Sequence, residues 1–205
     1  MLGFGEHILA SVVRLTEGLF LTFLIAVPAG LLLSYSPKIN KIGSPILYFS
    51  YPIPKLALLP VVMLLMGIGE SAKITMIVLI LVFQVTVTVR DAVLRIPRED
   101  FHVLISLGAN QRQLLRWVIF PAILPDLLTS LRVAVGTAAS VLFFTETFGT
   151  DKGIGFYIVD AWMRLAYKDM AIGIVALSLT GLAFFSAIDL LEKRLCKWKT
   201  ILNKK

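Results

Sequence analysis

Three ionisable side chains, Lys55, Arg132 and Glu146, lie within or at the ends of segments that are otherwise apolar. A charge in such a segment is costly unless it faces a partner, a cavity or water, so it indicates a functional site. Two cations in this setting can attract an anion, and a carboxylate near a helix end can act in a gate or contact a second protein. Each residue has a structural alternative. Lys55 can snorkel to the interface, Arg132 can pair with another helix, and Glu146 can mark a wetted helix end.

A run of small residues surrounds Gly136, at positions 134–140. Small side chains let two helices approach closely. The run therefore predicts an interface with a second copy, a pathway lining, or close packing within the chain. Nearer the start, Arg14 and Glu17 are three residues apart, which predicts an ion pair on one helix face.

The sequence contains no pattern typical of a catalytic centre. His7 and His102 are too isolated to form a metal site, and Cys196 is the single cysteine. No phosphate-binding loop of the form G-x-x-x-x-G-K-[ST] occurs. We therefore expect a protein that is not an enzyme, has no metal or cofactor of its own and cannot hydrolyse ATP by itself.

The composition is that of a membrane protein. Of the 205 residues, 58% are hydrophobic and 16% are charged, against about half and roughly a quarter in soluble domains. A helix needs about 20 mainly apolar residues to cross the hydrocarbon core. The sequence predicts an all-α polytopic fold, a single membrane domain over residues 1–205. Its five spans are expected at residues 8–35, 42–66, 74–89, 124–148 and 170–191.

Lysine and arginine are distributed unevenly between the two sets of loops. Thirteen of the 20 fall in one set, which contains the insert at 90–121 and the C-terminal tail, and four fall in the other. Because cytoplasmic loops of membrane proteins are enriched in these residues, we predict an N-terminus outside and a C-terminus in the cytoplasm. The net charge of +7 has the same explanation, so no nucleic-acid partner is expected.

The insert at 90–121 has the local signals of two short helices joined by a tight turn. Pro97 suits the start of a helix and Gly108 suits its end. Asn110 and Gln113 have the spacing of a capping box. The insert can lie on the lipid headgroups with its arginines on anionic lipid. Its small, exposed tip instead favours insertion into a cleft of another protein. Two prolines, Pro121 and Pro125, predict a bend into the fourth span.

The tip residues carry a family resemblance. Ser106-Leu107-Gly108-Ala109, followed thirteen residues after Gly108 by Pro121, resembles the cytoplasmic "EAA" loop of permeases of binding-protein-dependent ABC importers. Other runs resemble the sulfonate/taurine/nitrate branch of that family, namely residues 52–60, 67–70, 131–136, 145–146, 153–158 and 160–161.

The resemblance implies the fold of a type I ABC importer permease, placed in a bacterial inner (plasma) membrane. Two copies would enclose a pathway for a small anion or organic solute such as a sulfonate, taurine or nitrate. The implied partners are a cytoplasmic ATPase dimer holding ATP and Mg, an extracytoplasmic solute-binding protein, a second permease copy and lipid. Lys55, Arg132, Gly136 and Glu146 are expected to line or gate the pathway.

The loop at 97–121 is implied to contact the ATPase through Glu99, Asp100, His102, Ser106, Leu107, Gly108, Ala109 and Pro121. Where the family has Glu-Ala-Ala, this chain has His102-Val103-Leu104. Glu99 or Asp100, one turn upstream, is therefore expected to supply the missing acid. Two alternatives stay open: an ABC permease for a vitamin precursor of the thiamine-pyrimidine or riboflavin type, and an ATP-independent channel or secondary carrier.

Overall fold

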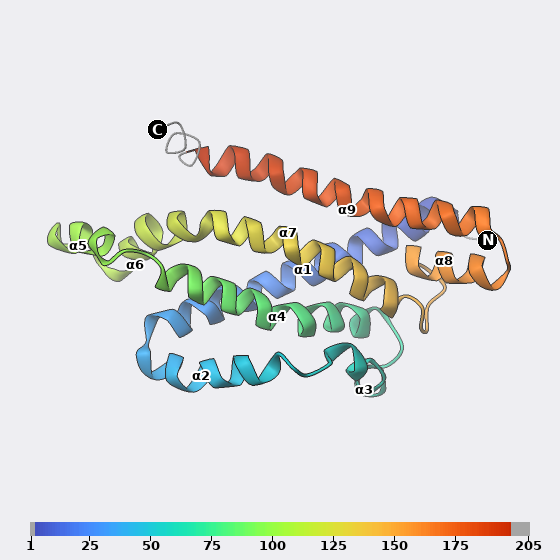
Figure 1. Cartoon of the computed structure of the whole chain (residues 1–205), viewed down its shortest axis with the longest axis horizontal. Helices are drawn as coiled ribbons and strands as arrows, with labels where there is room; N and C mark the ends of the chain where they lie inside the picture. The colour runs from blue at the N-terminus through green and yellow to red at the C-terminus, as the bar shows by residue number, and fades with distance from the viewer. Residues whose placement is uncertain (1–2, 198–205) are drawn as a thin grey trace.

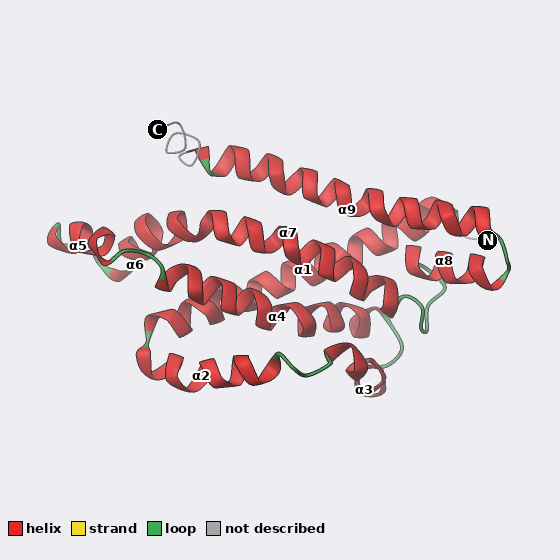
Figure 2. Ribbon diagram, viewed as in Figure 1, coloured by secondary structure: helices red, strands yellow, loops and turns green. Residues whose placement is uncertain are grey.

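The computed structural model describes residues 3–197, and all regular structure in that range is helical (Figures 1 and 2). The helices are α1 (Phe4–Tyr35), α2 (Pro37–Ser50), η1 (Lys55–Leu58), α3 (Leu59–Met66), α4 (Glu70–Leu94), α5 (Arg98–Ser106), α6 (Gln111–Leu114), η2 (Leu115–Ile119), α7 (Phe120–Thr145), α8 (Ile154–Met163) and α9 (Tyr167–Leu195). The all-α prediction is confirmed. Four helices are long and apolar enough to cross a membrane, and a bent pair of helices can count as a fifth span.

The centre of the molecule is a bundle of α1, α4 and α7, against which α9 packs through α7 and α8. Two glycines of α1 bring it close to α4. A Cβ on Gly18 would lie 2.7 Å from Cγ2 of Ile77, and one on Gly30 would lie 2.6 Å from Cβ of Val89. Glycine is therefore needed at both positions for the two backbones to approach this closely.

The second apolar segment, residues 42–66, contains four prolines, Pro45, Pro52, Pro54 and Pro60, which predict a broken span. It is broken into Pro37–Ser50 and Lys55–Met66, which make an angle of 83°. The break falls at Pro52 and Pro54, which supply no backbone N–H to continue a helix. Pro45, by contrast, is accommodated inside α2. The presence of a proline therefore does not by itself show where the helix breaks.

The insert has the two-helix form that its sequence predicts. Gly108 adopts φ +77° directly after α5, a left-handed conformation that favours glycine at a helix end. At the start of α6, the Gln113 N–H donates to Asn110 Oδ1 (3.0 Å), and the Asn110 N–H donates to Gln113 Oε1 (2.7 Å). This confirms the capping box.

Pro121 and Pro125 do not end the helix, and the bend predicted at these residues stays a prediction. The helix runs without a break from Gln111 to Thr145, through a π-helical turn at Leu115–Ile119. Pro121 gives no N–H to the carbonyl of Trp117 one turn earlier. A widened turn beside a proline accommodates this missing hydrogen bond without ending the helix.

The two ends of the molecule carry different elements. In Figure 1 the insert helices α5 and α6 project at one end of the long axis, while α3 and α8 lie at the other. The short helix α8 leaves its Trp162 exposed. The insert residues and Glu146, which follows α7 directly, therefore lie at opposite ends of the spans.

Candidate functional site

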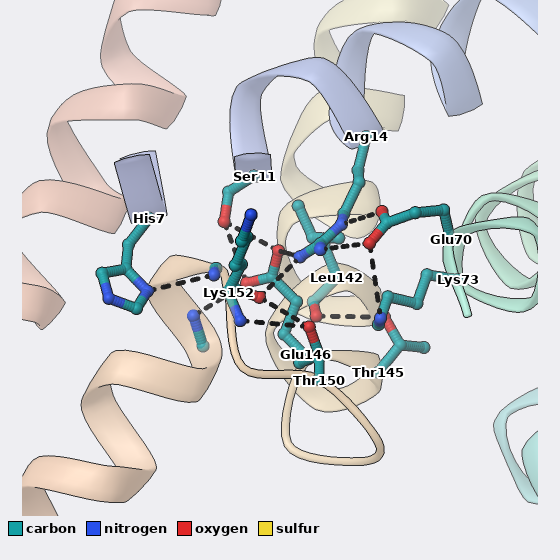
Figure 3. Close-up of polar contacts among 12 residues, drawn as sticks. His7, Ser11, Arg14, Glu70, Lys73, Leu142, Thr145, Glu146, Thr150 and Lys152 are labelled. Atoms are coloured by element: carbon teal, nitrogen blue, oxygen red, sulfur yellow. Dashed lines mark hydrogen bonds and ion pairs between the residues drawn. The ribbon is translucent and has the colours of Figure 1, made fainter. Parts of the chain in front are cut away.

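At the end that carries α3 and α8, a buried ionic cluster joins three spans. We define the ionic cluster as Ser11, Arg14, Glu70, Lys73 and Glu146 (Figure 3). Arg14 Nη1 donates to Glu146 Oε1 (2.7 Å) and to the carbonyl of Lys152 (2.8 Å). Its Nη2 donates to Glu70 Oε1 (2.6 Å), and its Nε donates to the other oxygen of the same carboxylate. One guanidinium therefore connects α1 to α4 and to α7.

The carboxylate of Glu146 is enclosed by donors from two elements besides Arg14. Ser11 Oγ lies 2.7 and 2.9 Å from the two carboxylate oxygens, and the Gly155 N–H donates to Oε2 at 2.8 Å. The Ser11 oxygen in turn accepts from the Ile154 N–H (2.8 Å). Glu146 itself is fully buried. Hydrogen bonds from this many donors hold the carboxylate in a fixed orientation.

Two glycines shape the start of α8 around Glu146, Gly153 just before the helix and Gly155 in its first turn. Gly153 has φ +125°, and a Cβ there would lie 2.3 Å from the carboxyl carbon of Glu146. A Cβ on Gly155 would lie 2.7 Å from the Phe143 carbonyl oxygen. The Gly153 N–H also donates to Nδ1 of His7 (3.2 Å). Glycine at both positions lets the loop backbone close over the carboxylate.

Two cations and two carboxylates compensate one another in the ionic cluster. Lys73 is buried and its Nζ lies 3.9 Å from Glu70 Oε1. Only Glu70 is open to solvent, with 61% of its side chain exposed. Removing one member of a buried pair typically costs about 3–5 kcal/mol because it leaves an uncompensated charge. The cluster therefore fixes the relative positions of the spans and has one solvent-facing member.

The sequence located only part of this cluster. Glu146 lies late in the fourth span as predicted, but it is buried, so the alternative of a wetted helix end is wrong. The predicted Arg14–Glu17 pair is also wrong, because the Arg14 guanidinium turns to Glu70 and Glu146. Ser11, Arg14, Glu70 and Lys73 are not among the predicted site residues. The feature of the sequence that could have indicated the cluster is Arg14, a cation within an otherwise apolar segment.

The two in-span cations contact different helices. Lys55 Nζ donates to the Ser50 carbonyl (2.6 Å) and lies 5.2 Å from the ring centroid of Phe83. Arg132 Nη2 donates to both Asp189 (2.6 Å) and Glu192 (2.8 Å) of α9. This contact is the structural pair with another span that the sequence left open for Arg132.

The small-residue run of α7 has one buried and one open face. Ala134 and Ala138 are buried, whereas Gly136 and Ser140 are exposed. A Cβ on Gly136 would meet no atom within 4 Å. Packing within the chain thus uses the alanines and leaves the Gly136 face free for another helix.

The predicted ATPase-contacting residues gather at the insert end. Glu99, Asp100 and His102 lie exposed along α5, and the Ser106 hydroxyl donates to the His102 carbonyl (2.9 Å). Leu107 is 80% exposed, so the tip presents an apolar side chain.

Two neighbouring hollows divide these residues further. Leu107, Gly108 and Ala109 line a hollow of about 320 Å³. Asp100 and Pro121 line another, of about 420 Å³. Asp100 is thereby brought to the same hollow as Pro121, whereas Glu99 lines neither hollow. This geometry makes Asp100 the better placed of the two candidate acids.

These features define an all-helical, multi-pass membrane protein with a protruding helix–turn–helix. The model of the family described as "Binding-protein-dependent transport system inner membrane component" matches residues 22–197. The chain belongs to this family, and it is a permease of an ABC importer.

Among characterised relatives, the chain is similar to the taurine transport system permease protein TauC of Escherichia coli (strain K12), with 32% identity covering 94% of this chain and 70% of TauC. It is 29% identical to the formylaminopyrimidine transport permease protein ThiX of Halalkalibacterium halodurans, over 96% of this chain and 78% of ThiX. A third relative is the putative aliphatic sulfonates transport permease protein SsuC of Bacillus subtilis (strain 168), 28% identical over 94% of this chain and 70% of SsuC.

A solved structure shares the fold. The chain is similar to a chain of the inward-facing MetNI methionine ABC transporter, with a TM-score of 0.77, 19% identity, and coverage of 92% of this chain and 94% of that one. At this identity the likeness shows the fold alone. The predicted family and fold are confirmed, and the family assignment disfavours the alternative of an ATP-independent channel or carrier.

Proposed function

We propose that two copies of this chain enclose a translocation pathway and that a cytoplasmic ATPase dimer drives transport through the insert. The observation that carries the proposal is the insert tip, where Gly108 at φ +77° presents an exposed Leu107 beside a hollow. An exposed apolar side chain on a rigid turn fits a cleft in a second protein. ATP and Mg belong to that partner, because this chain carries no phosphate-binding loop.

The charge distribution supports one orientation. The basic insert lies in the cytoplasm, and the ionic cluster lies at the extracytoplasmic end. A solute-binding protein would then deliver its substrate to the surface formed by α3, α8 and the loop between α7 and α8. Glu70 is the solvent-facing member of the ionic cluster on that surface.

The open face of α7 is the surface for the second permease copy. Gly136 and Ser140 lie exposed in an otherwise apolar helix. Small residues at such a face let the backbones of two membrane helices approach. A homodimer places these faces together around the pathway.

The substrate class we propose is a small organic anion of the sulfonate or taurine type. TauC and SsuC, which bear those substrates in their names, are 32% and 28% identical to this chain. A vitamin precursor of the thiamine-pyrimidine type is the second candidate, supported by ThiX at 29% identity. A positive pathway lining depends chiefly on Lys55, because two carboxylates already compensate Arg132.

Two measurements test this function. Purification with the co-expressed ATPase and binding protein should retain the ATPase subunit. The complex in liposomes, supplied with the binding protein, should then accumulate taurine or an alkanesulfonate only with ATP. Flux that is independent of ATP would contradict the proposal. Uptake of a formylaminopyrimidine in place of the anions would select the second substrate class.

A further inference from the structure

A cavity of about 580 Å³ lies between the insert and the ends of two spans. The ends of α1 and α4 form part of its lining. Its wall includes Leu31, Leu32, Val93, Leu94, Phe101 and Leu115. Tyr35, an exposed aromatic residue at the end of α1, stands at its rim. Tyrosine at the end of a membrane helix is typical of headgroup level.

Two arginines, Arg98 of α5 and Arg112 of α6, also line this cavity. Within residues 3–197 neither makes an ion pair. The remaining arginines of the insert are already engaged there: Arg90 with Asp91, Arg95 with Asp126, and Arg116 over the ring of Trp117. The cavity therefore combines an apolar wall with two cations whose charge the surrounding helices leave uncompensated.

The acids of α5 do not alter this charge balance inside the cavity. Asp100 lines the separate hollow of about 420 Å³, and Glu99 is not part of the cavity wall. The tip residues Leu107, Gly108 and Ala109 line the third hollow, not this one. The surface proposed to enter the ATPase and the arginine-lined cavity are therefore different faces of the insert.

We propose that this cavity binds an anionic phospholipid of the cytoplasmic leaflet. Its phosphate lies on Arg98 and Arg112, and an acyl chain follows the apolar wall of α1 and α4. The proposal rests on the proposed function for its orientation, because the insert end must face the leaflet rich in anionic lipid. Basic pockets between membrane helices on that side select such headgroups, and guanidinium groups bind phosphate through charge-assisted hydrogen bonds.

The occupant is a lipid and not the ATPase because the apolar wall belongs to the spans themselves. A bound lipid would hold α5 and α6 to the membrane ends of α1 and α4, which keeps the tip at a fixed height. The headgroup thereby contributes to coupling without touching the ATPase.

Native mass spectrometry of the purified permease–ATPase complex tests the proposal. The complex is first equilibrated with vesicles of phosphatidylglycerol and phosphatidylethanolamine. The double variant Arg98→Gln/Arg112→Gln is expected to lower the retained phosphatidylglycerol at least fivefold and to leave phosphatidylethanolamine unchanged. Arg116→Gln is the control for a charge of the same insert that lies outside the cavity, and it should retain wild-type amounts.

A second variant keeps all charges and fills the apolar part of the cavity. Leu32→Trp is expected to reduce retained phosphatidylglycerol to a similar extent, with an unchanged unfolding temperature. Equal retention in the double variant, the same loss in Arg116→Gln, or displacement of the lipid when the ATPase binds would each overturn the proposal. Lipid retention is also measured on the permease before ATPase is added. A failure to bind the lipid can therefore be distinguished from a failure to bind the ATPase.

Discussion

Arg14 of α1 and Glu146 of α7 form a buried ion pair, with 2.7 Å between Nη1 and Oε1, although 132 residues separate them in the chain. The same guanidinium holds Glu70 at the start of α4. The pair is therefore the point at which three spans are joined at one end of the molecule. Its partners are side chains on different helices, so its loss affects the arrangement of the bundle more than any one helix.

Replacement of Glu146 by alanine should destabilise the protein by about 3–5 kcal/mol, because the buried Arg14 and Lys73 are left with a single carboxylate, Glu70, to compensate them. The unfolding temperature in detergent, followed by fluorescence, measures the loss. Replacing both residues, as Arg14→Met/Glu146→Leu, should recover part of it. Glu17→Ala is the control, since this exposed carboxylate does not pair with Arg14. An equal loss in the control would show that the pair has no special role.

Replacement of Gly108 by arginine should uncouple ATP hydrolysis from transport while the spans stay folded. The side chain adds bulk to the tip, and a non-glycine residue at φ +77° strains the turn. ATPase activity and substrate uptake are measured in the same liposomes. Ser106→Arg adds the same charge two residues earlier, where no positive φ is required, and separates the strain from the charge. Wild-type coupling in Gly108→Arg would mean that the tip is not the contact.

Replacement of Gly136 by leucine should leave the monomer folded and weaken the dimer at least tenfold. A side chain there meets no atom of its own chain within 4 Å, but it would separate two apposed α7 faces. Dimer dissociation in detergent, measured by light scattering over a dilution series, gives the effect. Gly181→Leu on α9 is the matched control, because it likewise meets nothing within 4 Å. A dimer as stable as the wild type would place the interface elsewhere.

Single methionine variants of Lys55 and Arg132 should distinguish a cation that lines the pathway from one that pairs two helices. Lys55→Met is expected to raise the KM for an anionic substrate severalfold with little change in unfolding temperature, because its main contact is a backbone carbonyl. Arg132→Met should instead lower the unfolding temperature, since Asp189 and Glu192 lose their shared partner. Transport and thermal unfolding are measured on both variants. The reverse pattern would assign the pathway charge to Arg132.

The features predicted correctly from the sequence are those with local causes. The turn at Gly108 and the capping box of Asn110 and Gln113 depend on residues within four positions of one another. The apolar segments are set by their length alone. The position of the break near Pro52 was not predictable in the same way, because helices accept some prolines, such as Pro45, and break at others.

The ionic cluster depends on packing that no local pattern encodes. Arg14 and Glu70 are 56 residues apart, on different helices. The nearest acid in sequence, Glu17, offered a plausible but incorrect partner. Only the close approach of α1 to α4, which the glycines of α1 allow, brings the true partner within reach.

The π-helical turn at Leu115–Ile119 helps to set the direction in which the insert tip points, independently of which residues form the tip. An α-helix advances by 3.6 residues per turn, so each residue corresponds to a rotation of about 100°. Deleting one residue from this turn would restore ordinary helical hydrogen bonding. It would also swing the tip through about that angle around the axis of α7, with every tip residue unchanged. A single insertion or deletion in this turn can therefore change how the tip fits its ATPase. The change is larger than one produced by a substitution at the contact surface.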